Sequence, residues 1–356
     1  MEDFNRILAS RIGIEQIEAN YDTIKIANRV SAIVEKRKKA ALSGDNYSTI
    51  DKIEYQLGIV YNDISELITS VAPFFLQKHS RKINKILRNA LLGKDIQEGR
   101  KSIARQVFGD IPKEVVAQIV RNQNVPARIL KAMQRTRMTP RAYAQAIAIQ
   151  RDPVLRASLV SNYFNMVRNT AYTVTRTSAA AMMGQARMRA YGAIPKDLVG
   201  FQVHGILDER IRPAHRARNG TIYYKNPNYG QPGLPEMPNP PLEADGSTAF
   251  NCRCWLTPIL SSLSNKFYDF KGRIIPNARI FDEWFGSSVK DLQILAIGVK
   301  RYNAATKRLK KGEQLKWHHL LDPVSGMLLD SDEIANETPT ARANRIKKAK
   351  NLIAKG

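Results

Sequence analysis

The chain has 356 residues, of which 43% are hydrophobic and 25% are charged. This composition is typical of an ordered globular protein rather than a disordered polycation, and the length predicts about two or three domains. No apolar run approaches the roughly 20 residues of a membrane span, so we expect no membrane partner. Two cysteines are too few for a secreted disulfide scaffold.

The positive charge is large and unevenly distributed. There are 56 Lys and Arg against 32 Asp and Glu, a net charge of +24. Residues 101–200 carry 16 basic and 4 acidic side chains, so 16 − 4 = +12, half of the total, lies in this segment. Uncompensated charge of this size favours a polyanionic partner, first nucleic acid and second an acidic protein. No zinc-finger spacing, basic zipper or RNP signature is present, so we expect contact with DNA to be non-specific.

The end of the chain is a basic tail over 331–356. It supplies the candidate DNA contacts, which are Arg342, Arg345, Lys347, Lys348 and Lys350. The segment 345–355 is expected to form either a final basic helix or an unstructured arm.

The first 190 residues predict helices. Apolar residues at steps of three or four run from Ile50 to Val71 and predict an amphipathic helix that ends at Pro73. A second apolar series runs from Leu76 to Leu91 and ends at Gly93. Further helices are expected around 95–108, 112–122 and 126–136, then from Thr139-Pro140, and finally a long helix from Asp152-Pro153 to Gly192.

After Pro195 the pattern changes to short strands. Residues 200–204 alternate as in a strand, and residues 221–224 follow the turn signal Asn219-Gly220. A third strand is expected over 254–259, where Pro258 indicates an edge position. Between the last two strands lies a proline-rich loop over 226–250.

Short helices are expected again around 280–285 and 289–309. The predicted fold class is therefore mainly α with a small antiparallel β element. We expect an extended helical region over 1–150, with contacts to a partner protein and to DNA, and a compact α+β domain over 151–330.

Cys252-Arg253-Cys254 is the most unusual local pattern. A disulfide between the two cysteines would close a strained small ring. If the segment is a strand, both side chains share one face, which permits either packing as small buried hydrophobes or shared ligation of zinc. The further ligands considered are His215 and either His204 or Asp208. No other cofactor is predicted.

The segment from Asp208 to His215 concentrates acid, base and imidazole in a short loop. It is suited to an acid/base pair, but we favour a network of ion pairs and hydrogen bonds that orders the loop. Trp317-His318-His319 faintly resembles the start of a His-Asn-His nuclease, without the downstream metal ligands. Phosphate-binding loops, dinucleotide fingerprints and serine-hydrolase elbows are absent from the sequence, so we expect neither an enzyme nor a small-molecule substrate.

Three groups of residues, in order, resemble the phage Mu protein F-like domain of minor head proteins from tailed double-stranded DNA phages. The first group is Asp208, Arg210, His215, Asn219 and Gly220, and the second is Asn251, Cys252, Arg253 and Cys254. The third comprises 281–284, 298–302 and 320–322, while Arg176-Thr177 matches an Arg-Thr pair that often precedes the domain. The chain departs from the family at Ile211, where Thr is usual, and at Ala249-Phe250, where His often occurs.

The resemblance implies a structural virion protein at the portal vertex inside the head, made in the host cytoplasm. Its implied partners are the portal protein, packaged DNA, and a major capsid or scaffold protein. Its implied roles are head assembly, DNA retention or DNA delivery. Two alternatives are a metal-dependent nuclease or transferase using His215, Cys252, Cys254 and His318, and a basic nucleic-acid-binding protein of the host.

Overall fold

The computed structural model describes residues 4–43, 50–91, 112–135, 140–192, 198–205, 211–224, 240, 248–260, 278–324 and 328–355. These ranges are mainly helical with one small antiparallel sheet, which confirms the predicted fold class. The helix expected around 95–108, most of the proline-rich loop, Asp208 and Arg210 lie outside the described residues.

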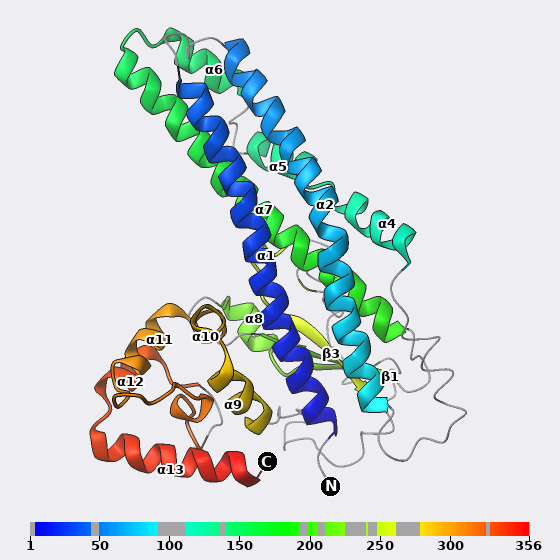
Figure 1. The fold of residues 1–356 in the computed structure, drawn as a ribbon, viewed down its shortest axis with the longest axis vertical. Coiled ribbons are helices and arrows are strands. Elements are labelled where there is room, and N and C mark those ends of the chain that lie inside the picture. Colours follow the sequence, from blue (N-terminus) through cyan, green and yellow to red (C-terminus); the bar gives the residue numbers. More distant parts are fainter. Residues whose placement is uncertain are drawn as a thin grey trace.

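Three long helices run side by side along the long axis of the molecule (Figure 1). They are α1 (Phe4–Leu42), α2 (Ile50–Leu91) and α7 (Pro153–Gly192). Each is about 60 Å long at 1.5 Å per residue. Apolar side chains at helical spacing face the common axis of the bundle, where Val30, Ile64 and Phe164 are fully buried. The long helix expected from Asp152-Pro153 is therefore confirmed.

The predicted end of a helix at Pro73 is wrong, because α2 continues through this proline to Leu91. Proline inside a helix removes one hydrogen bond and clashes with the preceding turn, at a cost of about 3 kcal/mol. Ala72, Phe75 and Leu76 on either side of it are buried in the core of the bundle. Tertiary packing of these side chains outweighs the local penalty, so the two expected helices are one.

Three short helices cover the side of the bundle formed by α2 and α7. They are α4 (Lys113–Gln123), α5 (Val125–Arg135) and α6 (Pro140–Ile149), close to the expected positions. Asn124 separates α4 from α5 in a left-handed conformation with φ 35°, which Asn tolerates better than most residues. The sharp turn lets both helices place apolar faces on the same bundle.

The sheet lies at one end of the bundle (Figure 1). Its antiparallel strands are β1 (Leu198–His204), β2 (Ile222–Tyr224) and β3 (Trp255–Leu260), in the order β2-β1-β3. The helix α8 (Pro213–Arg218) lies between β1 and β2 in the chain. All three expected strands are confirmed, and β3 with Pro258 is at an edge, as predicted.

The remaining helices pack beside the sheet end of α1 (Figure 1). They are α9 (Ala278–Ser287), α10 (Lys290–Ile297), α11 (Val299–Thr306), α12 (Ser331–Asn336) and α13 (Pro339–Lys355). The single helix expected over 289–309 is wrong, because Gly298 adopts φ 85° and separates α10 from α11. The end of the chain is a helix rather than an unstructured arm.

Two hydrophobic cores hold these parts together, and each combines residues from before and after residue 150. One core fills the bundle, and the other joins α1, α2 and α7 to the sheet and to the C-terminal helices. Gly13 on α1 permits close contact there, since an added Cβ would lie 3.1 Å from the Trp255 ring. Among the described helices, none is long and apolar enough to cross a membrane.

Candidate functional site

Residues far apart in the sequence meet where α7 passes the segment that precedes β3. The Thr177 hydroxyl on α7 accepts a hydrogen bond from the backbone N–H of Asn251 at 3.1 Å and donates one to the Thr173 carbonyl at 2.8 Å. Arg176 and His215 line the same pocket as Asn251 and Cys252. The Arg-Thr pair, His215 and the Asn-Cys-Arg-Cys segment are therefore neighbours in space.

Asn251 turns the chain toward β3 in a left-handed conformation with φ 59°. The Cys252 N–H donates to the Ala249 carbonyl at 3.1 Å, and an Arg212 guanidinium N–H donates to the Phe250 carbonyl at 2.9 Å. Asparagine is one of the few residues that adopt this conformation at low cost. The turn directs both cysteine side chains toward His215.

His215 lies on α8 and is buried, with 7% of its surface exposed. The turn after α8 is held by Gly220, with φ 85°, whose N–H donates to the Val203 carbonyl at 2.8 Å. The Asn219 side-chain carbonyl accepts from the Gly205 N–H at 2.9 Å. Hydrogen bonds of Asn219 and Gly220 therefore hold the end of α8 against the end of β1.

Gly205 is a site residue that sequence reasoning missed. A Cβ at this position would lie 3.3 Å from the Cys254 sulfur and 2.9 Å from the Ile211 side chain. In the sequence, the one sign of a role for Gly205 is its position directly after an expected strand. That position does not indicate its contact with Cys254, which is distant in the sequence.

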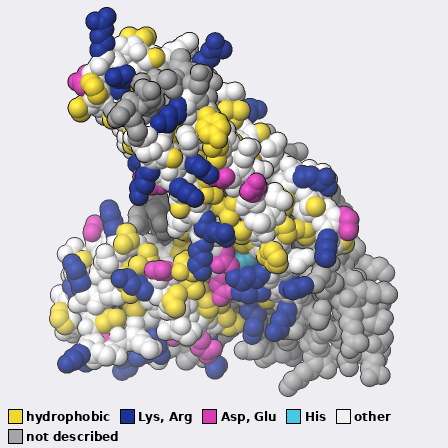
Figure 2. Space-filling model, turned by 45° about the horizontal axis from the view of Figure 1, so that its top comes forward, with side chains coloured by type: hydrophobic (Ala, Val, Ile, Leu, Met, Phe, Trp, Pro, Cys, Tyr) yellow, Lys and Arg dark blue, Asp and Glu magenta, His cyan; other side chains and the backbone are white. Residues whose placement is uncertain are grey.

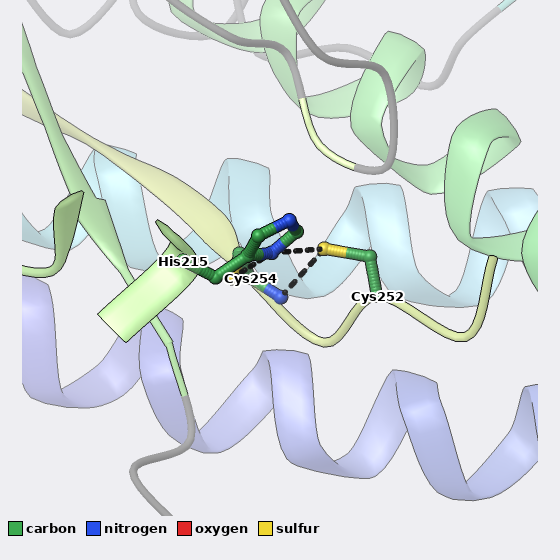
Figure 3. Close-up of side chains that lie close together, drawn as sticks. All are labelled: His215, Cys252 and Cys254. Carbon is green, nitrogen blue, oxygen red and sulfur yellow. Dashed lines mark hydrogen bonds between the residues drawn. The ribbon is translucent and has the colours of Figure 1, made fainter. Parts of the chain in front are cut away.

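His215, Cys252 and Cys254 form one compact cluster (Figure 3). The His215 Nδ1 atom lies 3.4 Å from the Cys254 sulfur and 3.6 Å from the Cys252 sulfur. The Cys254 backbone N–H donates to the Cys252 sulfur at 3.4 Å. Both cysteines are free thiols. Among the described residues, this is the one group of at least three such side chains whose ligand atoms all lie within 4.8 Å of one another.

The two thiols have different acidities. A hydrogen bond from the Cys254 thiol is the main cause that lowers the pKa of Cys252 to about 6, against the opposing effect of burial. The backbone N–H of Cys254 and the His215 ring act in the same direction. Donating to Cys252, together with burial, raises the pKa of the Cys254 thiol. Cys252 is therefore the more acidic of the two thiols.

Basic side chains surround this cluster. A pocket of about 320 Å³ is lined by the three cluster residues together with Arg176, Arg212 and Arg253. A second pocket, of about 450 Å³, shares Phe250 with the first and is lined by Arg128, Lys131 and Arg135. No acidic side chain is among the described residues that line either pocket. We call these the thiol pocket and the α5 pocket. Sequence reasoning identified the positive charge of residues 101–200 but not this surface.

The other histidines considered as ligands lie elsewhere. The His204 ring stacks on the Trp255 ring with centroids 5.6 Å apart, and burial lowers the pKa of His204 to about 4. His318 bonds the Asp282 carboxylate at 2.9 Å, on α9. Neither belongs to the cluster, whose ligand atoms lie within 4.8 Å of one another. Asp208, the remaining ligand considered, lies outside the described residues.

The candidate DNA contacts on α13 fall into two groups. Lys347, Lys348 and Lys350 are exposed. Arg345 is largely buried and binds the Glu337 carboxylate at 2.8 and 2.9 Å, as well as the Leu321 carbonyl at 3.1 Å. Arg342 is partly exposed. Arg345 therefore holds α13 in place, and the three lysines present their charges to solvent. Figure 2 shows one face of the molecule on which Lys and Arg side chains outnumber Asp and Glu.

No family model, curated protein or solved structure matches this chain. The resemblance to the Mu protein F-like domain therefore depends on the motif residues and on their order in the sequence.

Proposed function

We propose that the chain is a structural minor head protein of a tailed phage, bound at the portal vertex inside the head. One observation carries the proposal. Four parts of the motif meet around a single turn although they lie on separate elements, namely Arg176-Thr177, His215, Asn219-Gly220 and Asn251–Cys254. Hydrogen bonds join Asn251 to Thr177 and Gly205 to Asn219, and the His215 ring contacts both cysteine sulfurs.

The basic pockets support a role beside packaged DNA. Six cationic side chains line the two pockets, and guanidinium and ammonium groups bind phosphates without reading sequence. Non-specific contact with phosphates suits a protein that meets DNA of any sequence.

Exposed apolar side chains at one end of the bundle support docking to the portal protein through an apolar surface. Ile149 at the end of α6 and Val154 and Leu155 at the start of α7 have 81%, 75% and 50% of their surface exposed. The end of α6 and the start of α7 lie at the end of the bundle away from the sheet (Figure 1). We call these three residues the tip patch. Exposed aliphatic side chains at one place are typical of a protein interface.

The proposal is tested by co-sedimentation with the portal protein encoded in the same phage genome. We expect binding that survives high salt, because an apolar interface is not screened by ions. The double variant Ile149→Asp/Val154→Asp is expected to weaken binding, by about 10-fold or more for two buried aliphatic side chains. Val324→Asp, at a position 92% exposed outside the tip patch, is the matched control.

Two outcomes would contradict the proposal. Absence of portal binding at any salt, with DNA binding intact, would indicate a general basic DNA-binding protein. Turnover of DNA or of a transferase substrate that requires a metal and is lost in His215→Ala would indicate an enzyme instead.

A further inference from the structure

We propose that His215, Cys252 and Cys254 hold a zinc ion whose fourth coordination position opens into the thiol pocket. The proposed role in the phage head does not require a metal, so this inference goes beyond it. The observations that carry it are the geometry of the three ligand atoms, the charge around them and their place in the fold.

The geometry of the cluster fits tetrahedral zinc. Zinc bonds of about 2.3 Å to sulfur and 2.0–2.1 Å to nitrogen place the two kinds of ligand atom about 3.6 Å apart at tetrahedral angles. The His215 Nδ1 atom lies 3.4 and 3.6 Å from the two sulfurs. One ring nitrogen has a single proton or a single lone pair, so it cannot make two good hydrogen bonds. A metal ion between the three atoms satisfies all of them.

The backbone is arranged to support a thiolate ligand. The Cys254 N–H points at the Cys252 sulfur at 3.4 Å. Hydrogen bonds from surrounding groups to metal ligands orient them and tune their basicity. The turn at Asn251 and the packing of Gly205 against the Cys254 sulfur set the direction of both cysteines before any metal binds.

The local charge is consistent with this metal. Arg176, Arg212 and Arg253 line the pocket and would repel a bare divalent cation. Two thiolates cancel the charge of Zn²⁺, and a neutral imidazole adds none, so the complete centre carries no net charge. Paired sulfur ligands with imidazole favour zinc over the hard cations Mg²⁺ and Ca²⁺, which prefer oxygen ligands.

The site joins parts of the chain that are far apart. His215 on α8 and Cys252 before β3 are 37 positions apart, and the intervening segment includes β2 and the proline-rich loop. A zinc bond across this interval would close the loop at its base. Because the pocket borders the three ligands, the fourth position is accessible to water or a small anion.

The test is the metal content of the full-length purified protein after zinc loading and gel filtration. We expect about one zinc ion per chain. Cys252→Ser, Cys254→Ser and His215→Ala are each expected to lose the bound zinc. His204→Phe is the matched control, since it removes an imidazole while keeping an aromatic ring on Trp255, and it is expected to keep the metal.

Cobalt(II) substitution of the wild-type protein provides a readout that does not depend on the variants folding. We expect sulfur-to-cobalt charge-transfer absorption together with the strong visible bands of a tetrahedral ion. Azide is expected to shift the visible bands if the fourth position is open. An unchanged spectrum would show that the centre is closed by a fourth protein ligand, which would overturn that part of the proposal.

Three results would overturn the zinc site itself. They are a folded wild-type protein that takes up no zinc, zinc that persists in the double variant Cys252→Ser/Cys254→Ser, and a mass two hydrogens lower, which would show a disulfide. Each is independent of portal binding, so failure of this proposal and failure of the proposed function are distinguishable.

Discussion

At the scale of single residues, the most consequential feature outside the thiol pocket is a buried ionic network within the bundle. The His79 ring on α2 is fully buried and lies 2.7 Å from a Glu15 oxygen and 3.0 Å from an Asp22 oxygen. Arg187 on α7 binds Glu15 at 2.9 Å, and Lys78 binds Asp22 at the edge of the network. Each buried charge thus has an opposite partner, and loss of one partner costs about 3–5 kcal/mol.

The network predicts a dependence of stability on pH. Burial alone would lower the pKa of His79, but hydrogen bonds to Asp22 and Glu15 outweigh it and raise the pKa. The stabilisation from His79 is therefore complete below about pH 6.5 and is lost as the pH rises through the raised pKa. For Glu15, the Arg187 charge and His79 outweigh burial and lower the pKa. That contribution is lost as the pH falls below about 4.

The measurement is the free energy of unfolding of wild type and His79→Gln between pH 6 and pH 9. We expect the wild type to lose its advantage over the variant as the pH rises, by about 1.4 kcal/mol per unit by which the pKa is raised. The comparison between the two proteins is needed because other groups of the protein also titrate between pH 6 and pH 9. His319→Gln is the control of opposite sign. Because burial lowers the pKa of His319 to about 4, the wild type should gain stability over this variant as the pH rises through the unfolded pKa of about 6.5. A constant difference between wild type and His79→Gln would contradict the prediction.

At the scale of secondary-structure elements, α2 shows how packing overrides a local signal. Pro73 interrupts the hydrogen bonds of the helix, yet the same helix buries residues of both cores, with Ile64 in one and Leu87 in the other. If the helix broke at Pro73, the apolar side chains on one side of the break would lose their packing partners in one of the two cores. The helix is retained because the buried area on both sides exceeds the cost of the proline.

We expect Pro73→Ala to raise the free energy of unfolding by about 1–3 kcal/mol, because alanine restores the backbone N–H and removes the clash of the ring. Chemical denaturation at constant pH measures the change. Phe74→Ala, at a neighbouring position 76% exposed, is the control and should change stability by less than about 0.5 kcal/mol. A loss of stability in Pro73→Ala would mean that the proline shapes the packing of Phe75 and Leu76.

At the scale of the whole molecule, the residues that stabilise the fold differ from the residues that carry the positive charge. The cores are apolar, and basic side chains at the surface include those of the α5 pocket, the thiol pocket and α13. A surface of this kind binds polyanions through release of counterions, so its affinity for DNA depends steeply on salt. The α5 pocket and α13, which are far apart in the sequence, should contribute separately to the affinity for DNA, and each contribution can be measured.

We expect affinity for random-sequence duplex DNA to fall linearly with salt on logarithmic axes. Lys131→Glu/Arg135→Glu in the α5 pocket and Lys347→Glu/Lys348→Glu on α13 should each weaken binding and reduce the slope by about 2, if each residue contacts one phosphate. All four side chains are exposed, so the variants should fold. Fluorescence anisotropy over a salt series measures both quantities.

The control for this prediction is Lys300→Glu/Lys310→Glu. It makes the same change in net charge at two exposed positions outside both surfaces. An equal loss of affinity in all three double variants would show that total charge, rather than the α5 pocket or α13, determines DNA binding.

The sequence by itself determined the elements whose signals are local. Apolar residues at helical spacing predicted the first part of α2, Thr139-Pro140 and Asp152-Pro153 predicted the starts of α6 and α7, and alternation with the Asn219-Gly220 turn predicted the strands. A helix or a tight turn depends on residues within a few positions of one another, so the signal and the structure coincide. The pairing of Cys252 with Cys254 and the candidacy of His215 were also evident, because the motif residues are few and chemically distinctive.

Only the tertiary structure decided which distant groups meet. The continuation of α2 through Pro73, the hydrogen bond between Thr177 and Asn251, and the position of His215 between the two sulfurs depend on contacts across the fold. The buried pairing of His79 with Glu15 joins residues 64 positions apart, and no local pattern indicates it. Such contacts form because burying apolar faces brings particular helices and strands together, and their polar residues must then find partners in that arrangement.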